Sequence, residues 1–266
     1  MPCGGRIFLP MPDSRAYPGQ HATELGPELQ YFHRALLAAY GPQGWWPTTP
    51  AGQVRPRYRV GVRRPLVPRE QWEIAVGAVL TQNTAWRNVE QALGNLASEG
   101  LVSPTAVAGT EPGALAALLR PSGYYNQKAR RLHLLATHVV EGYGGRIRAL
   151  LRRPAAPLRQ ELLAVWGIGP ETADSILLYA AGRPSFVIDT YTRRIMGRLG
   201  VVPADLSYQE MQSLFVASLP ADPDLFGEYH ALLVRHATTR CRSTPVCAGC
   251  VLRPRCAHGR DHTELP

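Results

Sequence analysis

The sequence predicts an all-α fold built from many short helices. After residue 70, apolar residues recur at three- and four-residue spacing along almost the whole chain, which is the period of an amphipathic helix. Gly or Pro interrupts this pattern at short intervals, and the alternation typical of strands is scarce. A chain of 266 residues can form one large domain or two that pack closely.

The N-terminal part is less regular. Residues 1–26 carry Pro, Gly and small polar residues without periodicity, and we expect a loose arm that contains Cys3. Residues 27–40 are expected to form the first helix, because their apolar side chains share one face. That face consists of Leu29, Phe32, Leu36 and Leu37.

A stretch rich in Gly, Pro and Arg follows at 41–70, and we expect a loop or short hairpin. Six arginines and no acid lie between residues 55 and 69, which indicates either a contact with phosphate or a solvated loop. The remaining helices are expected at 70–80, 84–98, 104–109, 112–119, 126–141, 145–151, 157–165, 171–181, 190–199, 207–218 and 222–239.

The formal net charge is +9, from 29 basic and 20 acidic side chains. This balance favours a polyanionic partner such as nucleic acid, although an arginine-rich genome would also produce it. The only lysine is Lys128, which we expect at the surface or at a phosphate. Because arginine cannot act as an amine nucleophile, any Schiff-base chemistry must use Lys128 or the α-amino group.

The sequence contains no signal for a membrane or for secretion. No apolar run reaches the roughly 18 residues of a membrane span. The first residues lack the apolar stretch of a secretory signal. We therefore expect no membrane partner and an intracellular, cytoplasmic protein.

The segment 158–182 (LRQELLAVWGIGPETADSILLYAAG) combines two amphipathic helices with a glycine-rich turn. Gly167 and Gly169 permit a tight turn with exposed amides, and Ile168 would anchor it in the core. Amides at the start of a helix bind phosphate whatever the base sequence. The pattern predicts a helix-hairpin-helix that binds the DNA backbone, with a plain αα-hairpin as the alternative.

Asp189 follows the apolar run FVI and opens a helical pattern. A carboxylate at this place can cap the helix, or it can stand beside a cleft at the start of the helix. The two roles are compatible.

Four of the five cysteines cluster near the C-terminus, as C-x5-C-x2-C-x5-C. In an intracellular chain such clustering indicates metal ligation rather than disulfides. Four thiolates at this spacing suit a tetrahedral zinc ion or a [4Fe–4S] cluster, and the spacing alone does not decide. The candidate ligands are Cys241, Cys247, Cys250 and Cys256.

In this order, the GIGPETAD hairpin, Asp189 and the four cysteines resemble the endonuclease III branch of the helix-hairpin-helix DNA glycosylases. The resemblance covers roughly 27–256. Three further segments look like the members that excise alkylated purines such as 3-methyladenine: GPQGWWP (41–47), LTQNTAWRNVEQAL (80–93) and SGYYNQKARRL (122–132).

The resemblance implies two helical domains that flank a DNA-binding cleft. A six-helix barrel with the helix-hairpin-helix would take 64–184, and a domain with a structural [4Fe–4S] cluster would take 185–256. The helix in 27–63 would pack with the cluster domain, and 257–266 would form a tail.

The resemblance also implies roles for individual residues. Asp189 would assist departure of the base, either by stabilising an oxocarbenium-like sugar or by activating water. Gln82 would fill the gap left by a flipped nucleotide, with a buried capping amide as the alternative. Contacts with DNA are expected from Gly167, Ile168, Gly169, Arg193 and Arg242, and stacking on the base from Trp86 and Tyr191.

This sequence departs from the bifunctional members of the family at residue 171. Those members have a lysine at this hairpin position, which forms a Schiff base with the sugar, whereas this chain has Glu171. A carboxylate cannot form an imine. Glu171 is therefore either a first-turn acid favoured by the helix dipole or a second acid in the cleft.

We accordingly expect a monomeric, monofunctional DNA glycosylase that acts on double-stranded DNA with a damaged base, preferably an alkylated purine. Its AP lyase activity would be absent or weak. One alternative is an endonuclease III relative with weak activity on oxidised pyrimidines. Another is a non-catalytic protein that binds damaged or unusually structured DNA.

Overall fold

The computed structural model describes residues 20–60, 66–203 and 205–261, and this part of the chain is helical without a β-strand. The expected all-α fold is confirmed. Thr48 and Arg57 form an antiparallel bridge that closes a short hairpin in the Arg- and Pro-rich stretch. None of the described helices is both long and apolar enough to cross a bilayer.

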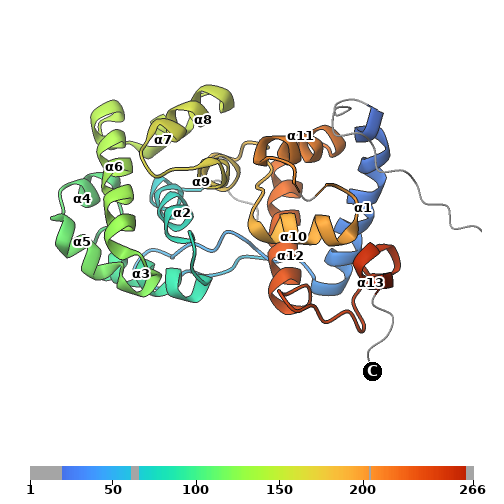
Figure 1. The fold of residues 1–266 in the computed structure, drawn as a ribbon. Helices are drawn as coiled ribbons and strands as arrows, with labels where there is room; N and C mark the ends of the chain where they lie inside the picture. Colours follow the sequence, from blue (N-terminus) through green and yellow to red (C-terminus); the bar gives the residue numbers. More distant parts are fainter. Residues whose placement is uncertain (1–19, 61–65, 204, 262–266) are drawn as a thin grey trace, which may run out of the picture.

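The helices fall into two groups that lie side by side, with α2–α9 in one and α1 with α10–α13 in the other (Figure 1). The elements are α1 (Gln20–Tyr40), α2 (Pro68–Leu80), α3 (Trp86–Ser98), α4 (Pro104–Ala108), α5 (Pro112–Leu118), η1 (Arg120–Ser122), α6 (Tyr125–Tyr143), α7 (Ile147–Leu151), α8 (Ala155–Ala164), α9 (Pro170–Ser175), η2 (Ile176–Ala180), α10 (Thr190–Leu199), α11 (Tyr208–Ser218), α12 (Pro223–Thr239), η3 (Arg253–Arg255) and α13 (Ala257–Asp261).

The first domain encloses a hydrophobic core that extends in sequence from Trp72 to Ala180. Its helices begin and end where the sequence supplies caps. The Ser103 hydroxyl accepts from the amide of Ala106 at the start of α4. Gly144, with a φ of +60°, ends α6 in the left-handed conformation that glycine adopts without strain.

The second domain combines α1 with the C-terminal helices around a separate core. Phe32 of α1 is fully buried, and α1 packs against α11 and α12. Phe186, which follows the first domain in sequence, stacks on Phe215 of α11 with ring centroids 4.0 Å apart. The core therefore includes residues from both ends of the chain.

Two expectations at the chain ends need correction. Helix α1 begins at Gln20 and includes Pro27, so residues 20–26 are helical rather than part of a loose arm. The apolar periodicity predicted this helix only from residue 27 onwards. The rest of the arm, with Cys3, lies outside the described residues. The expected tail also begins as a helix, because α13 packs against α10.

The two cores meet at η2, a turn of π-helix that continues the second helix of the hairpin. The amide of Ala181 donates to the carbonyl of Ile176 (3.0 Å), five residues back, so the turn is wider than an α-turn. Leu177 belongs to the first core and Leu178 to the second, and Tyr179 packs against both. This single turn therefore connects the two domains.

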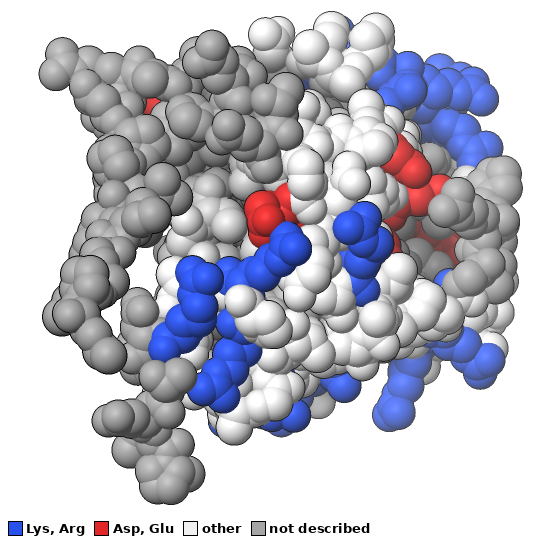
Figure 2. Space-filling model, turned by 90° about the vertical axis from the view of Figure 1, so that its right-hand side faces the viewer, with Lys and Arg blue, Asp and Glu red and all other residues white. Residues whose placement is uncertain are grey.

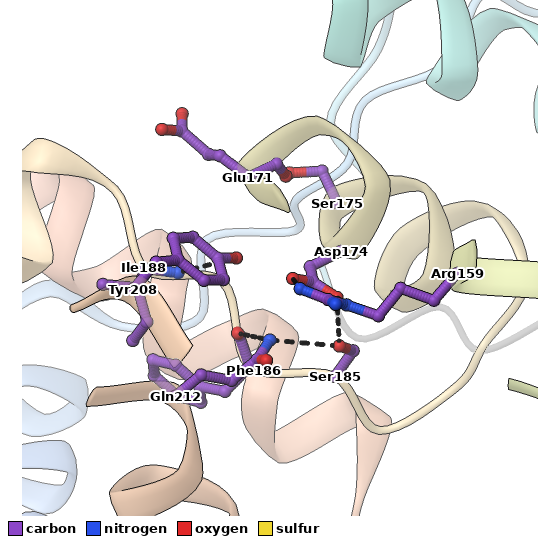
Figure 3. Close-up of polar contacts among 9 residues, drawn as sticks. All are labelled: Arg159, Glu171, Asp174, Ser175, Ser185, Phe186, Ile188, Tyr208 and Gln212. Atoms are coloured by element: carbon purple, nitrogen blue, oxygen red, sulfur yellow. Dashed lines mark hydrogen bonds and ion pairs between the residues drawn. The ribbon is translucent and has the colours of Figure 1, made fainter. Parts of the chain in front are cut away.

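A buried ion pair joins the two helices of the hairpin, and its carboxylate also binds the segment that leads to the second domain (Figure 3). Asp174 of α9 is fully buried and binds the Arg159 guanidinium through two hydrogen bonds of 2.8 and 3.0 Å. The hydroxyl of Ser185, in the segment between the domains, donates to the same carboxylate (2.7 Å). Asp174 thereby joins α8, α9 and the interdomain segment.

Helix α11 contacts the remainder of this segment. The Gln212 side chain donates to the carbonyl of Phe186 (2.8 Å), and the amide of Ile188 donates to the hydroxyl of Tyr208 (3.4 Å) (Figure 3). The backbone that leads to Asp189 is therefore attached to α11 at two points.

Removing the Asp174 carboxylate is expected to lower the free energy of unfolding by about 2–4 kcal/mol, because Arg159 would keep its charge in a partly buried place. The measurement is urea unfolding of Asp174→Ala. Glu28→Ala is the matched control, because Glu28 pairs with Arg255 at the exposed surface (2.7 Å) and such pairs contribute at most about 1 kcal/mol. Equal losses in the two variants would contradict the role assigned to the buried pair.

Candidate active site and cysteine site

The hairpin between α8 and α9 contains a tight turn. Gly167 has a φ of +84°, and a Cβ there would lie 2.4 Å from Cγ of Arg131, so glycine is required. Ile168 is 4% exposed and packs in the first core. Gly169 has a φ of −90°, and an added Cβ would have no neighbour within 4 Å. Contacts within the protein therefore do not require glycine at 169, and the space beside it is open.

Asp189 caps α10 and is 8% exposed. Its Oδ1 accepts from the amide of Thr192 (2.6 Å), and its Oδ2 lies 3.6 Å from Nε2 of His230. Burial by itself would raise the pKa of Asp189, but the contact with His230 and the Thr192 amide outweigh it and lower the pKa. Asp189 is therefore a buried carboxylate that stays ionised.

Sequence reasoning missed His230 and Tyr179. Nδ1 of His230 lies 2.8 Å from the hydroxyl of Tyr179, so a polar contact extends from Asp189 through α12 to η2. The sequence signal for His230 is one histidine among the buried positions of a helix, where a core residue is the commoner interpretation. Tyr179 owes its position to the π-turn, which the sequence pattern does not reveal.

Glu171 lies in the first turn of α9 and is exposed. Its carboxylate points away from the Asp174 network (Figure 3). Partial burial and the charge of Asp189 raise the pKa of Glu171, and His230 opposes this shift. Glu171 is thus a first-turn acid, as one alternative held, and it also lies within electrostatic reach of Asp189.

A group of aromatic rings lies beside this site. Trp86 contacts Trp45 and Trp46 with ring centroids 4.6 and 5.4 Å apart, and Trp46 lies 5.2 Å from Tyr179. Tyr191 is not in this group, because its ring faces the Arg194 guanidinium and the second core. Of the two aromatic residues predicted to stack, Trp86 therefore belongs to the aromatic group, which reaches Tyr179 through Trp46.

Gln82 contacts the hairpin. Its amide nitrogen donates to the hydroxyl of Thr172 (2.8 Å) and to the carbonyl of Gly167 (3.3 Å), and its oxygen accepts from Arg131. Gln82 is partly buried and connects the loop after α2 with the turn that precedes α9.

Lys128 is not at the surface, and the expectation that placed it there is wrong. Its side chain is 1% exposed, and Nζ donates to the carbonyls of Leu80 (2.9 Å) and Ser122 (2.6 Å). Burial and the charge of Arg131 lower the pKa of Lys128 to about 8. The ammonium group binds the last carbonyls of α2 and η1 and is enclosed by the first domain, so it is not accessible to a sugar.

The four cysteines line one cavity beside α10 and α12. Burial, together with neighbouring thiolates, raises the pKa of Cys250 and Cys256, so ionised sulfurs here need positive charge to balance them. Within the described ranges, no three His, Cys, Asp or Glu side chains converge on one metal position. A single zinc ion would need its sulfurs within about 4 Å of one another. The cysteine sulfurs that bind a four-iron cluster lie farther apart, because the cluster itself lies between them.

Hydrogen-bond donors are directed at these sulfurs. Arg198 Nη1 lies 3.4 Å from Sγ of Cys241, the amide of Gly259 lies 3.3 Å from Sγ of Cys256, and His236 Nε2 lies 3.7 Å from Sγ of Cys250. N–H groups around thiolates are typical of iron–sulfur sites. Thiol ligands that line one cavity and face such donors fit a thiolate-bound metal group, either zinc or an iron–sulfur cluster.

Arginine side chains gather on part of the face seen from the side of α1 and α13, with few acids among them (Figure 2). Arg242 is exposed beside the cysteines, and its carbonyl accepts from Arg198. Arg193 is only partly exposed, and its guanidinium donates to the carbonyl of Leu206. Arg242 is therefore free to contact a partner, whereas Arg193 also has a structural role.

Comparison with known proteins connects this geometry with a family. The model of the HhH-GPD superfamily of base excision DNA repair proteins matches residues 76–220. A Methanocaldococcus jannaschii protein named as a DNA repair glycosylase is 40% identical over 225 residues, which cover 84% of this chain and 93% of that protein.

Two solved structures are also similar. A trapped covalent intermediate of endonuclease III with DNA has a TM-score of 0.69 at 20% identity, covering 90% of this chain and 99% of that one, and shows the fold. The H. pylori 3-methyladenine DNA glycosylase bound to 1,N6-ethenoadenine has a TM-score of 0.60 at 26% identity, covering 82% and 97%. The family match extends over more than half of the chain, so the protein belongs to the HhH-GPD superfamily of base excision repair proteins and is a DNA repair glycosylase.

Proposed function

We propose that the protein is a monofunctional glycosylase that hydrolyses the N-glycosidic bond of a damaged base in double-stranded DNA and prefers alkylated purines. The observation that carries the proposal is a pair of carboxylates, Asp189 and Glu171, within electrostatic reach of each other. Glu171 stands at the hairpin position where bifunctional relatives have lysine. Two acids and no amine suit hydrolysis, whereas Schiff-base formation needs an amine.

Asp189 is the group that assists departure of the base. The sugar gains positive charge as the bond to the base breaks, and a buried, ionised carboxylate stabilises that charge more strongly than a solvated one. Alternatively, Asp189 accepts a proton from the attacking water. Both roles need the ionised form, which the contacts with Thr192 and His230 favour.

The enclosure of Lys128 supports the absence of lyase chemistry. Its amine is bound to two backbone carbonyls and is 1% exposed, and the chain has no second lysine. An abasic sugar at the hairpin would therefore meet Glu171 and not a lysine amine.

The aromatic group favours an alkylated purine as the substrate. Trp45, Trp46 and Trp86 are partly exposed and contact one another, and Trp46 lies beside Tyr179, which contacts His230. Stacking on indole rings favours a cationic base, and a positive charge also weakens the bond to the sugar. The similarity to the H. pylori 3-methyladenine glycosylase supports the same substrate class.

The hairpin is proposed to bind the DNA backbone. The open space beside Gly169 lets a phosphate approach the amides at the start of α9. Gln82 is proposed to enter the duplex when the damaged nucleotide is flipped. It must then release its hydrogen bonds with Thr172 and Gly167.

Cys241, Cys247, Cys250 and Cys256 are proposed to hold a [4Fe–4S] cluster. When bound, the cluster supplies a structural crosslink and not redox chemistry. It connects α12 with η3 and α13 and so supports the surface that carries Arg242.

The first prediction concerns substrate and catalysis. Duplexes that carry 3-methyladenine, 1,N6-ethenoadenine or oxidised pyrimidines are incubated with the protein, and base release is scored separately from strand scission. We expect release of alkylated purines with the strand intact. Asp189→Asn should slow release roughly a hundredfold or more while DNA affinity stays equal or rises, because a negative charge is lost.

Asparagine also caps helices well, so Asp189→Asn should fold. Asp222→Asn is the matched control, because Asp222 caps α12 away from the site. Release of oxidised pyrimidines alone would replace the substrate proposal. Wild-type turnover by Asp189→Asn would remove Asp189 from the mechanism.

The second prediction concerns the missing amine. Borohydride should trap little or no protein on abasic DNA, and strands should break only after alkali. Glu171→Lys should introduce trapping and Glu171→Gln should not, because only the former adds a nucleophile at that place. Strong trapping by the unmodified protein that Lys128→Met abolishes would refute the monofunctional proposal.

The third prediction concerns the cysteines. The purified protein should be brown, absorb broadly at about 400 nm and contain iron and sulfide. Cys247→Ser should lose the colour and unfold at lower temperature, whereas Cys3→Ser, outside the cysteine cluster, should match the wild type. A colourless protein with one zinc ion per chain would contradict the cluster.

A further inference from the structure

Asp189, His230 and Tyr179 form a line of buried polar contacts between the domains. His230 in α12 is 7% exposed, with Nε2 3.6 Å from Asp189 Oδ2 and Nδ1 2.8 Å from the hydroxyl of Tyr179 in η2. That hydroxyl also lies 3.1 Å from the carbonyl of Gly227. Nε2 of His230 makes no hydrogen bond to any described residue. Its distance of 3.6 Å from Oδ2 of Asp189 is slightly longer than a hydrogen bond. Catalytic hydrogen bonds are often long before substrate binds.

The positions of the hydrogens follow from the partners. If the Tyr179 hydroxyl donates to Nδ1, a neutral His230 carries its hydrogen on Nε2, facing Asp189. If the hydroxyl donates to Gly227, its oxygen accepts from Nδ1–H, and Nε2 then carries a hydrogen only in the doubly protonated ring. A hydrogen on Nε2 would in either arrangement face Oδ2 of Asp189.

The ionisable groups around Asp189 show why a hydrogen on Nε2 of His230 would stabilise its ionised form. The described ionisable groups whose interaction with Asp189 is resolved are Glu171 of α9, His230 and Tyr179. Burial, with the charges of Asp189 and Glu228, raises the pKa of Tyr179 well above its usual value, so Tyr179 remains a neutral donor. His230, together with the Thr192 amide, therefore offsets the cost of burying Asp189 beside the negative charge of Glu171.

We propose that Tyr179 fixes His230 with a hydrogen on Nε2, and that His230 thereby keeps Asp189 ionised and correctly oriented for base excision. Both are positioning residues that act through Asp189. Oδ1 is restrained by the Thr192 amide and Oδ2 by His230, so the plane of the carboxylate is set from two helices. The kinetic consequence rests on the proposed glycosylase function, whereas the hydrogen position does not.

The first experiment needs no activity. ¹⁵N NMR of the complete protein labelled at its histidines reports which ring nitrogen is protonated, and the His230 signals are those missing from His230→Gln. We expect a hydrogen on Nε2 at neutral pH. A neutral ring with its hydrogen on Nδ1 would overturn the proposal, whether or not the protein releases any base.

The second experiment compares single-turnover base release with pH in variants. Asp189 acts as a carboxylate, so release is lost as pH falls through its pKa. His230→Leu removes the donor and raises the pKa of Asp189. The acidic side of the pH–rate profile, called the acid limb, should therefore shift to higher pH by on the order of one pH unit. His230→Gln, whose amide can donate from the same place, should restore the wild-type limb.

Two hydroxyl variants separate positioning from packing. Tyr179→Phe keeps the ring against Trp46 but frees Nδ1, and should shift the limb part of the way. Tyr229→Phe removes a buried hydroxyl that has no partner among the described residues, and should change nothing. Equal slowing at every pH in His230→Leu, without rescue by His230→Gln, would show a structural role only and overturn the proposal. A wild type that releases no base refutes the proposed function, and the NMR result then decides the hydrogen position.

Discussion

An ionised carboxylate under protein cover is the constraint on which much of this structure depends. Burying a charge is costly unless hydrogen bonds or an opposite charge offset it. Asp189 obtains this from the Thr192 amide in its own helix and from His230 in α12, both of which belong to the second domain. The third member of the line, Tyr179, comes from η2, so the state of the carboxylate depends on how the domains pack.

The domain junction connects this arrangement with the hairpin that is proposed to bind DNA. Leu177 and Leu178 enter different cores from adjacent positions of one π-turn, and Asp174 binds both Arg159 and the segment that leads to Asp189. The hairpin and Asp189, the proposed catalytic carboxylate, are therefore attached to each other within about twenty residues of chain. A phosphate bound at the hairpin would place its sugar at a defined distance from Asp189.

Local signals predicted the helices well, because caps and glycines mark their ends. Helix α10 begins at the Asp189 cap and ends at Gly200, as its pattern indicates. The start of α1 was predicted at residue 27, whereas the helix begins at Gln20 and Pro27 lies inside it. Residues 20–26 lack the apolar periodicity that marks the rest of the helix, so the local pattern did not reveal them.

Only those residues of the candidate site that belong to a sequence motif could be predicted. Asp189, Glu171 and the cysteines belong to ordered motifs, but His230 and Tyr179 meet across 51 residues of chain through a π-turn. Lys128 was misplaced for a similar reason. Its carbonyl partners, Leu80 among them, are supplied by packing against α2, which periodicity does not reveal.

Because the one lysine, Lys128, is buried, the long cationic side chains at the surface are all arginines. Guanidinium groups stay protonated across the pH range in which proteins remain folded, whereas a lysine surface would lose charge above about pH 10. Attraction to a polyanion therefore persists in alkali, and ionic strength is the variable that releases such a protein. Alkaline titration of the reaction then reports on the chemistry at a nearly constant affinity for DNA.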